Sequence, residues 1–226
     1  MMRYISRIRT RFSSARLWYS LTSSGRLIVG QGSRCQLSHD SCVNILRQHT
    51  LRFGVGSRLV MEPGSSLTLH GDFSFADRCT VIVHQGGHLS LGAGGWCLHD
   101  CWLEVSPNGH IHIGDRSTLQ LRCNFHGSVS IGHDVLCAPD VYASSGGHRF
   151  DADPARTIRE QDALVPLHHR PVLIGDRCWL GLRTWIAPGV QLADGTVTGA
   201  NSVVTHDTRA FSVYAGIPAK LLRTYA

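Results

Sequence analysis

The sequence lacks several features that would point to common classes of protein. No apolar run reaches the 18 or so residues that a membrane-spanning helix needs. No pair of cysteines has the C-x-x-C spacing of a structural zinc site. Charged residues make up only 17% of the 226 residues, and 42% are hydrophobic, which is too apolar for a disordered chain. We therefore expect a folded domain with neither a membrane span nor a structural zinc ion.

Acidic residues are absent from the first twenty positions, where five arginines lie. The net charge of +6 comes largely from this segment, and the rest of the chain is close to neutral. A nucleic-acid-binding protein usually spreads basic and aromatic residues over its fold, so nucleic acid is not an expected partner.

The same segment, MMRYISRIRTRFSSARLWYS, lacks the continuous apolar core of a secretion signal. Its pattern is typical of a short basic amphipathic helix. Such a helix could cover one end of the domain, or it could contact an anionic membrane surface. The sequence leaves both interpretations open.

A six-residue period runs through much of the chain. Helices repeat at 3.6 residues and strands at 2, so neither explains a period of six. A hexapeptide repeat is the mark of a parallel β-helix, in which three hexads form one triangular coil with the aliphatic residue pointing inward. We expect coils of 18 residues, with Ile113 stacked on Ile131. One register in the C-terminal half consists of Ile174, Leu180, Ile186, Leu192, Thr198 and Val204.

A second run of the period covers 67–103 and, after a slip of four residues, continues over 113–143. The eight cysteines follow this pattern. Cys79, Cys97 and Cys137 occupy the aliphatic position, where a free cysteine behaves as a small buried hydrophobe. Cys101, Cys123 and Cys178 lie four residues after such positions, where a second small inward side chain fits. We therefore expect reduced thiols and a cytoplasmic protein.

The repeat predicts an all-β chain with three parts. Residues 1–26 form a basic N-terminal arm, 27–206 form the β-helix, and 207–226 form a C-terminal tail; short helical segments are expected at both ends. The hexads disappear over about 145–171. Because long loops without secondary structure are uncommon in compact domains, this extruded loop is expected to carry function.

Four stretches, IGHDVLCAPDVYASSGGH, IGDRCWLGLRTWIAPGV, GANSVVTHD and SVYAGIPAKLLR, point to a family. Residues 114–226, which contain them, resemble the hexapeptide-repeat acyltransferases, especially the sugar O-acetyltransferase and xenobiotic acetyltransferase branch. The resemblance implies a left-handed β-helix that works as a homotrimer. It also implies acetyl-CoA bound in a groove between neighbouring subunits.

The resemblance assigns His148, at the exit into the loop, as the general base. Trp179 matches a tryptophan that borders the acceptor and the acetyl-CoA, although a tryptophan at such a corner can also simply shield the core. Asn124 matches a position that often contacts the acceptor.

The acetyl-CoA site is expected among small, polar or cationic residues near the C-terminus. Thr205 and Ala200 match positions whose backbone meets the pantetheine arm. The only lysine in the chain, Lys220, matches a phosphate-binding position together with Arg223. His206 stands where the family commonly has lysine. The full set of candidates is Gly181, Gly199, Ala200, Thr205, His206, Lys220 and Arg223.

The sequence therefore predicts a trimeric, acetyl-CoA-dependent O-acetyltransferase that modifies a sugar hydroxyl of a polysaccharide or other glycan by direct transfer, in the cytoplasm or at the inner face of the membrane. A small-molecule acceptor is the alternative within the enzyme class, and a catalytically silent scaffold is the alternative outside it. No catalytic metal is expected: His168 and His169 lie near acidic residues, but no two histidines have the spacing of five that a zinc-binding β-helix uses.

Overall fold

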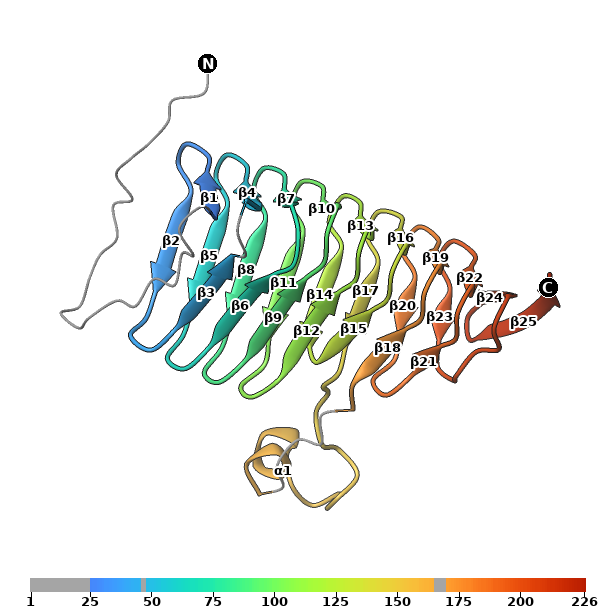
Figure 1. Ribbon diagram of the computed structural model, residues 1–226. Helices are drawn as coiled ribbons and strands as arrows, with labels where there is room; N and C mark the ends of the chain where they lie inside the picture. Colours follow the sequence, from blue (N-terminus) through green and yellow to red (C-terminus); the bar gives the residue numbers. More distant parts are fainter. Residues whose placement is uncertain (1–24, 46–47, 165–169) are drawn as a thin grey trace.

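The computed structural model of the protein describes residues 25–45, 48–164 and 170–226. Almost all of the predicted N-terminal arm, 1–26, lies outside the described residues. The described chain winds into a parallel β-helix whose three sheets form the sides of a triangular prism (Figure 1). The predicted fold class is confirmed, and the extruded loop leaves the prism between β17 and β18.

Each coil as far as β21 contributes one strand to each sheet, and the last coil contributes only β22 and β23 before the C-terminal strands. The first sheet contains β1 (Arg26–Val29), β4 (Thr50–Phe53), β7 (Phe73–Phe75), β10 (Gly95–Cys97), β13 (Thr118–Leu119), β16 (Leu136–Cys137), β19 (Trp179–Leu180), β22 (Val197–Thr198), β24 (Ser212–Gly216) and β25 (Ala219–Thr224). The second contains β2 (Arg34–Leu37), β5 (Arg58–Met61), β8 (Thr80–Val83), β11 (Trp102–Val105), β14 (Asn124–Gly127), β17 (Tyr142–Ser144), β20 (Trp185–Ile186) and β23 (Val203–Val204). The third contains β3 (Cys42–Ile45), β6 (Ser66–Leu69), β9 (His88–Leu91), β12 (His110–Ile113), β15 (Val129–Ile131), β18 (Val172–Ile174) and β21 (Gln191–Leu192).

Coil length differs between the two halves of the prism. In the C-terminal half Ile113 lies beside Ile131, so the predicted coil of 18 residues is correct there. In the N-terminal half Leu67 lies beside Leu89, so the coil is 22 residues long and the prediction is wrong. The longer coils have four-residue strands that bury two side chains per side, as Leu67 and Leu69 do. The six-residue count over 67–103 makes Gln85 an inward position, but Gln85 lies in an exposed turn.

The core is a set of inward columns that run from coil to coil. Phe53 and Phe75 in neighbouring coils stack with ring centroids 4.7 Å apart and nearly parallel. Such contacts add about 0.5–1.5 kcal/mol beyond the burial of the rings. One column of the first sheet consists of Phe53, Phe75, Cys97, Leu119, Cys137, Leu180 and Thr198.

The cysteines belong to this core. The six that the hexad pattern places inward are buried, and all eight are free thiols. Burial raises the pKa of the Cys178 thiol to about 11 and holds that of Cys137 well above its ordinary range. Since only the thiolate is a good nucleophile, these side chains act as packing groups.

The corner of the prism between the first and second sheets is turned by charged residues. Arg78, Asp100, Arg122 and Asp140 turn successive corners between the first and second sheets with φ between 56° and 63°. That left-handed conformation costs an L-residue about 1–2 kcal/mol. The side chains stack as bidentate pairs, with Arg122 Nε 2.7 Å from Asp140 Oδ1. Charge-assisted pairing of this kind offsets part of the strain, so these corners do not require glycine.

The C-terminal tail is a hairpin, so the predicted C-terminal helix is wrong. β24 continues the first sheet beside β22, and β25 returns antiparallel to it. The Tyr225 hydroxyl donates a hydrogen bond to the carbonyl oxygen of Gly195, which ties the chain end to the last coil. This hairpin satisfies a sheet edge that a helix would have left with unpaired backbone groups. In the part of the chain that the structure describes, no helix has the length and apolarity to cross a membrane.

Substitution of an inward residue should destabilise the prism far more than substitution of an outward one. Leu103→Ala removes a fully buried side chain from β11 and should lower the free energy of unfolding by about 2–5 kcal/mol. The matched control Leu173→Ala, on the outer face of β18, should cost below about 0.5 kcal/mol. Equilibrium denaturation at equal protein concentration measures both. Equal losses would contradict the assigned inward and outward faces.

Candidate functional site

The extruded loop folds back to orient His148. The imidazole Nδ1 lies 2.7 Å from Oδ2 of Asp162 on α1 (Ile158–Leu164). The backbone N–H of Arg149 donates to the other carboxylate oxygen, also at 2.7 Å. The His148 side chain is 76% exposed, and its Nε2 has no hydrogen-bond partner among the described residues. A carboxylate on Nδ1 therefore leaves Nε2 available to accept a proton from a bound molecule.

The charge state of Asp162 suits this role. The Arg149 N–H, and secondarily His148, lower the pKa of the Asp162 carboxyl below its ordinary value. The carboxylate is thus ionised at neutral pH. The stabilisation from its hydrogen bonds with His148 and Arg149 is fully present above the ordinary pKa of an aspartate. It is lost as the pH falls through the lowered pKa of Asp162.

Local hydrogen bonds give the loop its shape. Thr157 and Glu160 form a reciprocal cap at the start of α1, with the Thr157 N–H 2.8 Å from Glu160 Oε2. Gln161 is buried against the loop. Its Oε1 accepts from the N–H groups of Ala152 and Asp153, and its Nε2 donates to the Arg156 carbonyl. Asp162 is therefore presented by a folded loop.

The loop stands away from the prism at the corner between the second and third sheets (Figure 1). In the register of the second sheet, Ala143 lies beside Ile186 and Ile186 beside Val204. Thr205 and His206 follow Val204, so they turn the same corner two coils further on. The Thr205 hydroxyl is 2.9 Å from Nδ1 of His206. The loop with His148 and this exposed pair form one group of candidates.

Trp179 and the remaining donor-site candidates lie elsewhere. Trp179 points outward from the first sheet, is 55% exposed, and lies beside Leu136 and Val197. Gly181 and Gly199 follow strands of that sheet, and Ala200 turns its corner with the second sheet. Lys220 and Arg223 lie on β25, at the edge of the first sheet. Their long cationic side chains are exposed.

Close packing between coils accounts for the two glycines. A Cβ atom at Gly181 would lie 2.5 Å from the carbonyl oxygen of Thr198, and one at Gly199 would lie 2.8 Å from Cβ of Ala215. Glycine is thus required at both positions by the neighbouring coil.

Asn124 belongs to neither group. It begins β14 in the second sheet, and its Nδ2 donates to the Arg122 carbonyl at 2.7 Å. The structure does not bring it beside the loop or beside Trp179. Over the described ranges, no three His, Cys, Asp or Glu side chains gather closely enough to hold a metal ion.

The two groups lie on opposite sides of the molecule. In a triangular prism, the corner between the second and third sheets faces away from the first sheet. The group with His148 is at that corner, and the group with Trp179 is on the first sheet or its edges. A single site that uses both groups therefore needs two copies of the chain.

Comparison with known proteins agrees with the repeat. Residues 171–206 match a family model described as the hexapeptide repeat of succinyl-transferase. A putative lipopolysaccharide biosynthesis O-acetyl transferase, WbbJ, of Escherichia coli is 36% identical over 123 residues, which are 54% of this chain and 58% of that protein. The chain is thus similar to hexapeptide-repeat acyltransferases over about half of its length.

Two further proteins show how far the similarity of this hexapeptide-repeat chain extends. The galactoside O-acetyltransferase of Escherichia coli is 30% identical over 59% of this chain and 63% of that protein. The chain thus spans less than two thirds of the length of these curated relatives. The crystal structure of the polySia specific acetyltransferase NeuO superposes with a TM-score of 0.55 at 21% identity, covering 89% of this chain and 84% of that chain. That last similarity establishes the fold.

Sequence reasoning missed Asp162 as the partner of His148. His148 and Asp162 are 14 positions apart in a segment that follows no repeat, so no period could have paired them. The Thr157–Glu160 spacing, a capping signal, could have located the helix that carries Asp162.

Removal of the Gln161 anchor should loosen the loop without unfolding the prism. Gln161→Ala deletes three hydrogen bonds to the loop backbone and should raise the rate of tryptic cleavage after Arg149 and Arg156 severalfold. Arg159→Ala, an exposed change on the same helix, is the control and should leave these rates unchanged. Cleavage in native buffer, followed by mass spectrometry, measures the effect. A parallel loss of global stability would instead make Gln161 part of the core.

Proposed function

We propose that this protein is an acetyl-CoA-dependent O-acetyltransferase that transfers an acetyl group to a sugar hydroxyl of a polysaccharide or other glycan. The observation that carries the proposal is the His148–Asp162 pair, an exposed imidazole oriented by an ionised carboxylate on the loop that interrupts the repeat. The names of the two Escherichia coli relatives support the choice of acyl group and acceptor class.

In the proposed reaction, His148 Nε2 accepts the proton of the sugar hydroxyl. The oxygen then attacks the thioester carbonyl, and CoA leaves as the thiolate, which the imidazolium can reprotonate. Asp162 holds the Nδ1–H tautomer and stabilises the imidazolium while it exists. General-base assistance of this kind contributes about 10²–10⁴ in rate. No covalent intermediate on the protein is required, because the thioester is already an activated acyl donor.

The exposed residues at the C-terminal end of the first sheet fit the donor. Lys220 and Arg223 supply cations for the phosphates of acetyl-CoA, and Arg223 also lies over the Tyr225 ring at 5.9 Å. Ala200 is exposed at the corner between the first and second sheets, and Thr205 and His206 are exposed at the corner that carries the loop. Backbone groups at these two corners, contributed by neighbouring subunits, would reach the pantetheine arm.

A homotrimer would complete the site. Its loop group would meet the Trp179 face of the neighbouring subunit, so that acetyl-CoA and acceptor lie between the two. The opposite placement of the two groups on one prism supports this arrangement. Trp179 would then border the reacting atoms with an exposed ring, which can stack on a sugar face and offer its N–H.

We further propose that the protein is cytoplasmic. The eight cysteines of the described chain are free thiols, as a reducing compartment requires. Contact of the basic arm with an anionic membrane surface would bring the enzyme to membrane-bound glycans. Liposome association of the full chain, compared with a chain lacking residues 1–20, tests that contact.

Removal of the proposed base should abolish most turnover but leave the binding of the acyl donor unchanged. His148→Ala should lower kcat/KM for acetyl transfer by about 10²–10⁴, and Asp162→Asn should lower it less, since the imidazole remains. Thiol release from acetyl-CoA over a panel of glycans and small hydroxyl compounds measures the rate, and calorimetry with CoA measures donor binding. Near wild-type turnover of His148→Ala on the best acceptor would refute the assignment. Preference for a small molecule would favour the alternative acceptor class, and failure to bind CoA would favour a scaffold.

Mixed oligomers test whether each site spans two subunits. His148→Ala and Trp179→Ala chains, each weakly active alone, should regain activity when unfolded together and refolded. In a random mixture, roughly a quarter of the sites should combine an intact loop with an intact Trp179 face. Size-exclusion chromatography with light scattering verifies the oligomer. A mixture no more active than the average of its parents would place both residues in the same subunit's site.

A further inference from the structure

An apolar stripe runs along the outer face of the first sheet from Trp179 toward the N-terminal coils. Its large members are Trp96, Leu136 and Trp179, which are 37%, 51% and 55% exposed. The β-sheet register sets these side chains in one column, one per coil. The column consists of Ser74, Trp96, Thr118, Leu136, Trp179 and Val197.

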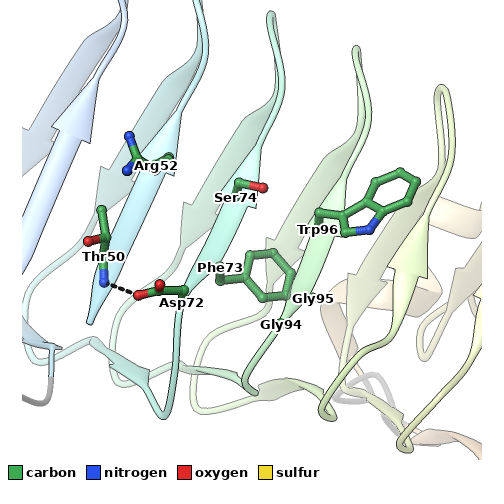
Figure 2. A pocket seen from close by; sticks show the side chains of 8 residues that line it. All are labelled: Thr50, Arg52, Asp72, Phe73, Ser74, Gly94, Gly95 and Trp96. Carbon is green, nitrogen blue, oxygen red and sulfur yellow. Dashed lines mark hydrogen bonds between the residues drawn. The ribbon is translucent and has the colours of Figure 1, made fainter. Parts of the chain in front are cut away.

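The stripe ends in a pocket of about 240 Å³ on β4, β7 and β10. Figure 2 shows the indole of Trp96 standing on one side of this hollow and Arg52 on the other, with Ser74 between them. Gly94 and Gly95 lie beside the tryptophan and contribute no side chain. A Cβ atom at Gly95 would lie 2.5 Å from the Phe73 ring, so packing against Phe73 requires glycine at this position. The lining residues are Thr50, Arg52, Asp72, Phe73, Ser74, Gly94, Gly95 and Trp96.

The two charged side chains of the pocket differ in their hydrogen-bond partners. The Asp72 carboxylate accepts the Thr50 N–H at 2.7 Å, with Oδ1 as acceptor (Figure 2). The Arg52 guanidinium is exposed and has neither a hydrogen bond nor an ion pair with any residue that the structure describes. A guanidinium offers a planar fork of donors that matches a carboxylate, and an exposed indole offers a flat apolar face. Together they suit a ring that carries a carboxylate.

We propose that this pocket binds a carboxylated sugar unit of the acceptor glycan, at a distance from the unit being acetylated. The proposal rests on the proposed function and specifies its substrate: an acidic glycan chain long enough to reach from Trp179 to Trp96. Those two side chains are three coils apart, about 14 Å at the usual spacing of neighbouring strands. The chain would follow the stripe, with one sugar ring stacked on Trp96 and its carboxylate on Arg52.

Binding of defined oligosaccharides to the full chain tests the proposal without requiring turnover. The probes are hexagalacturonic acid, galacturonic acid and the neutral maltohexaose, titrated by calorimetry at low salt. Wild-type protein should bind the acidic hexamer at least tenfold more tightly than the neutral hexamer or the acidic monomer. Trp96→Ala and Arg52→Gln should each weaken binding of the acidic hexamer about tenfold, and Arg52→Gln should in addition remove the preference over maltohexaose.

The control is Trp102→Ala, which removes a tryptophan of similar exposure, 40%, from the outer face of the second sheet. It should leave the affinity for all three probes unchanged. Equal affinity of the wild type for acidic and neutral hexamers, no effect of either pocket variant, or an equal effect of Trp102→Ala would overturn the proposal. So would a change of oligomeric state in Trp96→Ala, since the stripe would then be a contact between subunits.

The outcome separates this pocket from the proposed activity. If the variants lose acidic-hexamer binding although no glycan is ever acetylated, the pocket stands and the proposed function fails. If acetyl transfer to glycans depends on His148 but ignores Arg52 and Trp96, the proposed function stands and the pocket fails.

Discussion

Coil-to-coil alignment is the constraint on which the rest of the molecule depends. Each strand pairs with the strands one coil before and after it, so a residue's neighbours in space are fixed by the coil length. This alignment stacks Phe53 on Phe75 inside the prism and Arg122 on Asp140 at its corners. On the outside it sets Trp96 and Trp179 in one column. Packing, corner chemistry and the outer surface are three results of a single register.

A solenoid of this kind has no deep cleft of its own, so its chemistry must come from what is added to it. Here the addition is the loop between β17 and β18, which provides an oriented histidine at a corner. The surfaces that could hold substrates lie on another side. Assembly of copies is the direct way to bring the two together, which is why the proposed activity and the proposed oligomer are difficult to separate.

The sequence predicted the fold well where the period of the sequence repeat equals the length of a coil. Ile113, Ile131 and the C-terminal hexads follow a period that equals the coil, so their stacking could be foreseen. Gln85 could not be placed, because four-residue strands lengthen the coil without a local signal. The C-terminal hairpin depends on an open sheet edge that exists only after folding. Asp162 depends on a loop closure that no period encodes.

The loop has a consequence for how such a protein can change. Tyr142 and Trp185 are direct partners in the second sheet although they are 43 positions apart in the sequence, so the prism closes across the insertion as if it were absent. The entropy of closing a loop grows only as the logarithm of its length, and each doubling costs about 0.6 kcal/mol. The insertion can therefore be shortened, lengthened or exchanged with little effect on the scaffold. His148 and Asp162, the proposed base and its partner, lie in this exchangeable segment, so the proposed acceptor chemistry and structural stability can evolve independently.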